Sequence, residues 1–412
     1  MLLFRLSGFI FKFFHMKKIF FIVFLAHSVL QAQNPSGAVP DSSAVFEKGI
    51  FMEITDLSFI KNNEYFNLIA DGYTLFGNRI NPEIVYRPHP KYAVSAGVML
   101  LKYYGLDNFT STVPYFGLEI KDGNHTYYFG KLQSDDFHHL SRQLYDRERL
   151  FDARSVENGM EHRYQSKYWQ SDTWLEWEHF IQKNDDKRER LNFGHYSRYR
   201  YFHDKWQFAL PFQLYLHHRG GQINRRNTAS AGINNALVVA NMAFGLSLQR
   251  EIFKHHQAGV QFDAFFHFIN SQHTEEFIFE NGKAFQWRLF YTHSNFKVHV
   301  NYWQSHQFVS PKGDDMFQSV SRRVEKYVDS DGNVIPVFAT HTESDRKLLY
   351  GGFIYQNEIF KNLFLNFTTD IFYQLNESKI VTTVYQGHVS RHVDYNMGLQ
   401  LVFKLQHRLK SL

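Results

Sequence analysis

Apolar and polar residues alternate along most of this chain in segments of about ten to fifteen residues, which is typical of β-strands whose two faces meet different surroundings. The segment 395–405 has an apolar face formed by Tyr395, Met397, Leu399, Leu401, Phe403 and Leu405. Its opposite face carries Asn396, Gly398, Gln400 and Lys404. The segments 206–217, 296–303 and 363–374 repeat the alternation. The pattern predicts an all-β protein.

Short and long connections alternate between these segments, and this regularity narrows the fold. The short ones lie near His89-Pro90, Lys121–Asn124, Ser171-Asp172, His203-Asp204, Lys254–His256, His293-Ser294 and Lys361-Asn362. The long ones lie near 59–71, 106–112, 134–157, 181–188, 218–234, 270–283, 304–345 and 376–391. Transmembrane barrels have short periplasmic turns and longer extracellular loops. We therefore expect a transmembrane antiparallel β-barrel of about sixteen strands, with fourteen as the alternative and with both chain ends in the periplasm.

Composition supports a barrel that crosses a membrane. Aromatic residues make up 18% of the chain, with 43 Phe and 24 Tyr, yet the mean hydropathy is −0.40. Polar residues must therefore lie close to apolar ones, as they do where one strand face meets lipid and the other a wet lumen. An exported soluble β-protein shares this composition, so the argument for a membrane barrel depends on the alternating connection lengths.

The N-terminal region predicts export. Met16-Lys17-Lys18 precedes the apolar run Ile19–Ala26, and Leu30-Gln31-Ala32 supplies a cleavage position. The apolar run is too short to span a bilayer as a helix. We predict a cleavable signal peptide over 1–32, with Met16 as an alternative start, then a flexible leader over 33–45 and an outer-membrane β-barrel over 46–412.

Cysteine content and charge exclude several functions. The sequence holds no Cys, so it has no disulfide framework, thiolate metal site or cysteine nucleophile. The formal net charge of +5 includes four basic residues of the predicted signal peptide, Arg5, Lys12, Lys17 and Lys18. Without those four, 41 basic residues face 40 acidic ones. This balance gives no electrostatic argument for nucleic acid binding.

The strand faces opposite the apolar ones predict which polar residues line the lumen. They carry Glu119, Lys121, Glu176, Glu178, Arg198, Arg200, Asp263, His267, Arg288, Lys297, His299, Asp370 and Lys404. Both signs of charge occur, which indicates a hydrated or ion-paired interior without a clear ion preference. Glu176 and Glu178 share one face, and Arg198 and Arg200 on the next strand are the expected counter-ions.

The 23 histidines do not predict a metal site or a cofactor. His138-His139, His217-His218 and His255-His256 are doublets, but adjacent residues on a strand point to opposite faces and do not easily share one ion. Some outer-membrane barrels are lipid hydrolases that display Ser and His on the outer wall. The string Thr292-His293-Ser294-Asn295 is the suggestive one here, but a tight turn explains its Ser-Asn pair well and no acidic orienting residue accompanies it. We therefore expect that the chain is not an enzyme.

Two loops stand out. The longest, 304–345, is expected either to fold into the lumen and narrow it or to stand outside as a partner surface. The most basic, 218–234, carries Arg219, Arg225 and Arg226, which suit lipopolysaccharide phosphates or a solvated charge cluster.

Three strings resemble a family of predicted, porin-like outer-membrane barrels of Bacteroidetes-type bacteria. They are Leu57–Asn67 continuing to Gly72–Gly77, then Glu157–Met160 with Asp172–Glu178, and then His218–Ile223. The resemblance implies the outer membrane as the location and a barrel as the fold, and it transfers no catalytic or binding residue.

Three functions fit a barrel of this kind. The first expectation is a porin-like diffusion channel for small polar solutes, since about sixteen strands enclose an aqueous pore. The alternative is a plugged scaffold that binds a partner in an envelope complex, and the third is a barrel lipid hydrolase. The expected partners are outer-membrane lipid, lipopolysaccharide and small polar solutes, while the sequence leaves the oligomeric state open.

Overall fold

The structure is a computed structural model, and it describes residues 47–182, 185, 187–220, 236–270, 278–328, 334–376, 378–382, 386–389 and 393–411. The predicted signal peptide, 1–32, and the leader, 33–45, lie outside the described residues. No helix in the described part of the chain has the length and apolar character needed to cross a membrane.

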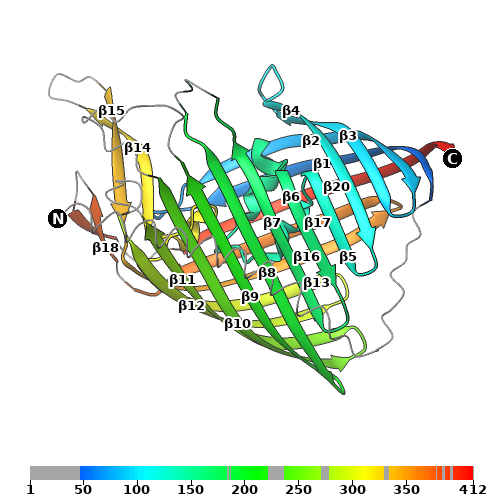
Figure 1. The fold of residues 1–412 in the computed structure, drawn as a ribbon. Helices are drawn as coiled ribbons and strands as arrows, with labels where there is room; N and C mark the ends of the chain where they lie inside the picture. The colour runs from blue at the N-terminus through cyan, green and yellow to red at the C-terminus, as the bar shows by residue number, and fades with distance from the viewer. Residues whose placement is uncertain are drawn as a thin grey trace, which may run out of the picture. The chain divides into compact units, whose positions relative to one another are not determined.

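Sixteen strands form one closed barrel in which each strand is antiparallel to both neighbours (Figure 1). They are β1 (Gly49–Glu64), β2 (Tyr73–His89), β3 (Tyr92–Tyr103), β4 (Ser111–Asp122), β5 (His125–Lys131), β6 (Asn158–Gln165), β7 (Trp169–His179), β8 (Arg190–His203), β9 (Trp206–Arg219), β10 (Leu237–Phe253), β11 (His256–Asn270), β12 (Asn281–His293), β13 (Phe296–His306), β16 (Asp345–Phe360), β17 (Leu363–Gln374) and β20 (Val393–Ser411). The ring closes where β1 pairs with β20, from Gly49 opposite Ser411 to Glu64 opposite Tyr395. The predicted all-β barrel and its sixteen strands are confirmed.

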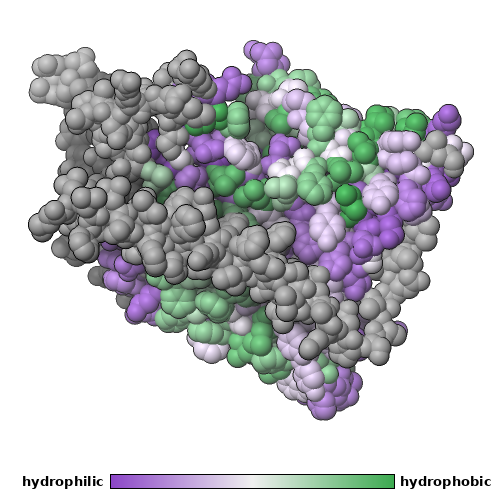
Figure 2. Space-filling model, in the orientation of Figure 1, coloured by the Kyte–Doolittle hydropathy of each residue, from purple (hydrophilic) through white to green (hydrophobic). Residues whose placement is uncertain are grey.

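The outer wall is mainly apolar, and the inner face carries many buried polar side chains, whereas a soluble protein exposes its polar side chains on the outside. In β20, Tyr395, Met397 and Leu399 are 41%, 44% and 41% exposed, while Asp394 and Asn396 between them are 2% and 1% exposed. Figure 2 shows apolar side chains gathered over parts of the outer wall, with hydrophilic ones beside them. This polarity suits a wall surrounded by lipid.

Tight turns join the strands at one rim, and long connections join them at the other. The turns follow β2, β4, β6, β8, β10, β12 and β16. One predicted turn is wrong, because Ser171 and Asp172 lie within β7, and the chain reverses instead at Ser166–Tyr168, where Ser166 N donates to Trp169 O at 2.7 Å. A Ser-Asp pair is common in turns, but here the two residues belong to the wall.

The wall is lowest at β5 and β6, which have seven and eight residues, whereas β10 and β20 have 17 and 19. Eight residues at 3.3 Å each, tilted by about 45°, stand only about 18 Å high. The connection that follows β5 turns inward over this low rim. On the long-loop side, β14 (Val320–Val328), β15 (Val334–Thr342), β18 (Ser378–Thr382) and β19 (Gln386–Val389) form a separate four-stranded sheet.

Candidate functional sites in the lumen and on the outer wall

Two long connections fold into the lumen, and we call them together the plug. The first, 132–157, carries the 3-10 helices η1 (Ser134–His139), η2 (Arg147–Phe151) and η3 (Ala153–Ser155). The second, 307–319, carries η5 (Asp315–Phe317). Backbone hydrogen bonds join them, from Asp146 N to Lys312 O at 2.6 Å and from Asp314 N to Arg142 O at 2.9 Å. Of the predicted long loop 304–345, the segment 307–319 enters the lumen as expected, while β14 and β15 belong to the separate sheet.

Apolar side chains seat the plug against the wall. Phe308, Met316 and Phe317 of the second connection are fully buried against wall residues that include Phe265 and Trp303. Further along the wall, Leu140 and Tyr145 of the first connection pack with Trp174 of β7 and Tyr215 of β9. Trp174 fits because Gly194 stands beside it, where a Cβ atom would lie 2.3 Å from the indole ring.

Buried ion pairs fix the plug to β7. Lys312 forms an ion pair with Glu176 and lies 3.5 Å from Glu178, and Arg149 lies 3.7 Å from Glu176. The prediction that Arg198 and Arg200 are the counter-ions is wrong. Glu176 lies opposite Asn192 in the β7–β8 register, and Arg198 lies six residues further along β8, opposite Gln170. The cations that pair with Glu176 come from the plug, whereas Glu178 also pairs with Arg190 of β8 at 3.2 Å.

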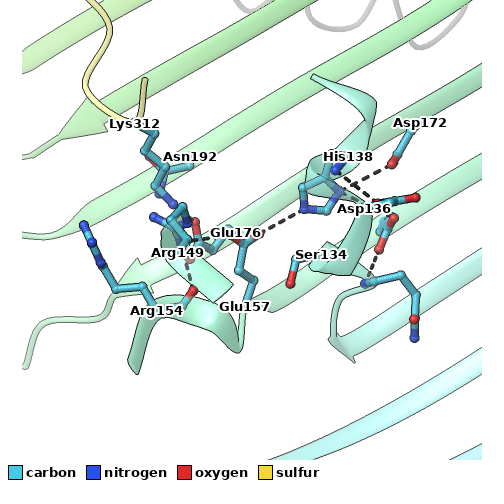
Figure 3. A network of polar contacts seen from close by, with 12 residues as sticks. Ser134, Asp136, His138, Arg149, Arg154, Glu157, Asp172, Glu176, Asn192 and Lys312 are labelled. Carbon is cyan, nitrogen blue, oxygen red and sulfur yellow. Dashed lines mark hydrogen bonds and ion pairs between the residues drawn. The ribbon is translucent and has the colours of Figure 1, made fainter. Parts of the chain in front are cut away.

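His138 stands at the centre of a second buried cluster (Figure 3). Its Nε2 lies 3.0 Å from Glu157 Oε2, and its Nδ1 lies 3.6 Å from Glu161 Oε1 and 3.4 Å from Asp172 Oδ2. The imidazole ring stacks on Trp174 with ring centroids 4.3 Å apart. Burial alone would lower the pKa of His138, but Asp172, Glu157 and Glu161 raise it well above the ordinary value.

A cavity of about 780 Å³ lies between the plug and the tight-turn rim, with Ser294 and Asn295 of a tight turn at its edge. Five predicted lumen residues line it, namely Arg198, Arg288, Lys297, His299 and Asp370. Arg142 of the plug also lines the cavity, where it forms ion pairs with Asp314 and, at 2.6 Å, with Asp370. The cavity is therefore polar and carries both signs of charge.

The other predicted lumen residues are distributed around the wall. Glu119 and Lys121 pair with each other at 3.0 Å, and Arg200 donates to Ser166 O at 3.0 Å near a tight turn. Asp263 is 2% exposed, and His267 accepts from Val309 N of the plug at 3.3 Å. Lys404 lines a second, smaller cavity.

The outer wall of β5 to β8 carries a group that sequence reasoning missed, which we call the outer-wall polar patch. It consists of His125, His162, Ser171, Thr173, His195 and Ser197. Each faces outward because its neighbours along the strand face the lumen, as Asp172 and Trp174 do on either side of Thr173. The sequence indicates this patch only through polar residues at positions where the alternation predicts an outward, apolar side chain, such as His162 between Met160 and Tyr164.

Strand register brings these residues together in two adjacent rows. In one row Thr173 lies opposite His162 on β6 and opposite His195 on β8. In the next row Ser171 lies opposite Ser197. Thr173 Oγ1 and His195 Nδ1 form a hydrogen bond of 2.8 Å, and His125 Nδ1 lies 3.0 Å from His162 Nε2. A hydroxyl thus stands between imidazoles on a surface that otherwise meets lipid.

The closed strand ring, its apolar outside and its polar inside define an outer-membrane β-barrel. More particularly, the chain belongs to the Lipid A 3'-O-deacylase-type family, whose model matches residues 40–412. The resemblance to outer-membrane barrels is confirmed. The expectation that the chain is not an enzyme is wrong, because the family is named for an enzymatic activity, the deacylation of lipid A.

Solved barrels with a related chain course are distant in sequence. Outer-membrane OmpT of Vibrio cholerae is 12% identical, with a TM-score of 0.44 over 86% of this chain and 97% of that one. OccK11 of Pseudomonas aeruginosa is 10% identical, with a TM-score of 0.47 over 88% and 98%. OprD of Pseudomonas aeruginosa is 10% identical, with a TM-score of 0.46 over 90% and 99%. No curated protein matches the chain.

Proposed function

We propose that this protein is an outer-membrane lipid hydrolase that cleaves an acyl ester of a lipid held against the wall of β5 to β8. The observation that carries the proposal is the 2.8 Å hydrogen bond between Thr173 Oγ1 and His195 Nδ1 on the outward face. Family membership supports it and names the substrate class, the acyl chains of lipid A. Outer-membrane lipid and lipopolysaccharide are then substrates rather than mere surroundings.

Polar groups on a lipid-facing wall are costly, so their presence calls for a reason. Ionisable residues within a membrane are rare and mark functional sites by default. Three imidazoles and three hydroxyls share the outer-wall polar patch, within two rows of strand register. An ordinary barrel wall would carry apolar residues at these positions, as β20 does at Met397 and Leu399.

The arrangement suits nucleophilic catalysis on an ester. His195 takes the proton of the Thr173 hydroxyl as its oxygen attacks the ester carbonyl, and the same proton then passes to the leaving alcohol. Water, activated by His195 in turn, releases the acyl group as a fatty acid. His162 lies opposite Thr173 on the other side, so that its imidazole can face the developing oxyanion.

The low wall gives an ester access to this patch. At about 18 Å high, β6 is shorter than the hydrocarbon core of a bilayer, which is about 30 Å thick. Lipid beside it must thin locally, which draws ester groups toward the wall. His162, near the middle of β6, then lies within about 9 Å of either rim.

Mass spectrometry of lipid A tests the proposal. The full-length protein is folded into vesicles that contain lipopolysaccharide, and the expected product lacks one acyl chain. Thr173→Val and His195→Asn are expected to lower the rate by about 100-fold or more. His293→Asn is the matched control, because His293 lies at a tight turn beside His256 and outside the patch. Unchanged lipid A with folded wild-type protein, or equal rates in Thr173→Val and wild type, would overturn the proposal.

A further inference from the structure

We propose that His138, Glu161 and Asp172 form a binding site for a divalent transition-metal ion of the Zn²⁺ type. The site joins η1 of the plug to the neighbouring wall strands β6 and β7. All three residues are buried, with His138 and Asp172 at 0% and Glu161 at 3% exposure. It is independent of the outer-wall polar patch, because Glu161 and Asp172 face the lumen.

The distances fit metal ligands better than hydrogen bonds. His138 Nδ1 lies 3.4 Å from Asp172 Oδ2 and 3.6 Å from Glu161 Oε1, and it makes no hydrogen bond. Hydrogen bonds from nitrogen to oxygen are about 2.7–3.2 Å long. Two ligands on a tetrahedral zinc ion, each at about 2.0–2.2 Å, are about 3.3–3.6 Å apart. Their ligand atoms all lie within 4.8 Å of one another.

The other ring nitrogen of His138 is held as it is in known metal sites. Nε2 donates to Glu157 Oε2 at 3.0 Å, so its proton is fixed on the side away from Asp172 and Glu161. Metal-bound histidines commonly donate their second N–H to a carboxylate in this way, which fixes the tautomer. Nδ1 faces the carboxylates of Asp172 and Glu161, and a metal ion bound between these three groups would take the place of the proton that the carboxylates favour on Nδ1.

Asp172 provides an independent observation. Its two carboxylate oxygens are buried and accept no hydrogen bond in the described part of the chain. Arg163 Nη2 lies 3.3 Å from Oδ2 without the geometry of a hydrogen bond, and Arg163 Nε donates to Glu161 Oε1, so a bound metal ion would share both carboxylates with this guanidinium. An unsatisfied buried carboxylate is costly, and a metal ion would satisfy it directly. One imidazole with two carboxylates suits zinc, whereas calcium and magnesium prefer oxygen ligands alone.

Metal binding by the purified, folded full-length barrel tests the proposal. After treatment with EDTA, Zn²⁺ titration followed by gel filtration and metal analysis is expected to give one tightly held ion per chain. Asp172→Asn and Glu161→Gln are expected to lose that ion. His139→Asn is the matched control, since His139 is adjacent but lies outside the group. Retention of the ion by both carboxylate variants, or its loss in His139→Asn alone, would overturn the proposal.

Co²⁺ bound to the wild-type protein gives a readout that does not depend on whether the variants fold. Intense visible absorption bands of a four-coordinate ion are expected, and Zn²⁺ should remove them at one equivalent. Only the weak bands of hydrated, six-coordinate Co²⁺ would overturn the proposal. A protease that cuts within 132–157 supplies a second readout, because bound Zn²⁺ should slow this cleavage in wild type and not in Asp172→Asn. Equal cleavage of wild type with and without Zn²⁺ would also contradict it.

Discussion

Lys312 and Glu176 form a buried ion pair in the lumen, although 136 positions separate them in the sequence. Lys312 belongs to the second plug connection and Glu176 to wall strand β7. Each side chain is 5% exposed. This contact shows how the plug neutralises Glu176, while Arg190 of the neighbouring strand β8 pairs with Glu178 at 3.2 Å.

Lys312→Met is expected to destabilise the barrel by about 3–5 kcal/mol, because it leaves Glu176 buried without its main cation. The urea concentration at which the folded band disappears from a gel measures this loss. The double variant Lys312→Met/Glu176→Gln should recover a large part of it. Lys91→Met is the control, since Lys91 and Asp122 pair at an exposed tight turn, and it should change the midpoint little. Equal midpoints for both lysine variants would contradict the expectation.

Gly194→Ala is expected to cost about 1–3 kcal/mol through overpacking. The new Cβ would lie 2.3 Å from the ring of Trp174, which in turn stacks on His138. Gly398→Ala is the matched control, because the nearest atom there is the Thr368 hydroxyl at 3.0 Å. The same unfolding assay compares them, and a larger loss in Gly398→Ala would speak against this packing.

Asp146 predicts a pH dependence of plug stability. Burial, reinforced by Asp314, raises the pKa of Asp146 from 3.8 to about 6, while Arg142 and Lys61 act in the opposite direction. The folded state therefore binds a proton that the unfolded state releases, so the free energy of unfolding falls as pH rises from about 4 to about 6. Asp146→Asn keeps the cap on Glu148 N and should flatten this part of the curve. Parallel curves for variant and wild type would refute the assignment.

The outer-wall polar patch predicts a conflict between stability and activity. Replacing both partners of a buried hydrogen bond with apolar groups is nearly neutral or stabilising. The double variant His195→Leu/Thr173→Val is therefore expected to be at least as stable as wild type. A gain in the free energy of unfolding in lipid would be on the order of 1 kcal/mol. Its hydrolytic rate should fall to the background level. A marked loss of stability in this variant would indicate that the pair serves the fold rather than catalysis.

Most of the barrel could be predicted from sequence, because lipid on one side and water on the other impose a period of two along every strand. The face with Leu363, Leu365 and Phe367 opposite Asn366 and Asp370 is as expected. Connection lengths added the order of turns and loops. These features are local, so neighbouring residues suffice to reveal them.

The sites could not be predicted, because they depend on contacts between distant segments. His138 meets Glu161 and Asp172 only after the first plug connection folds inward, and Lys312 reaches Glu176 across the lumen. The argument against the His138-His139 doublet as a shared metal site holds only for residues on a strand. The two residues lie in η1 rather than in a strand, and the group that gathers around His138 comes from other elements. The prediction of a turn at Ser171-Asp172 is wrong because a Ser-Asp pair occurs both in turns and in buried ionic sites, so its composition does not distinguish the two.

The seam between β1 and β20 has a consequence for how the molecule is assembled over time. Both plug connections lie between strands in the middle of the chain, after β5 and after β13, whereas the seam joins the first and last strands. While the seam is open, the strands form a curved sheet with one accessible side. The charged side chains of the plug enter most easily from that side, before the ring shuts. We therefore expect the β1–β20 seam to close only after both plug connections lie against the wall.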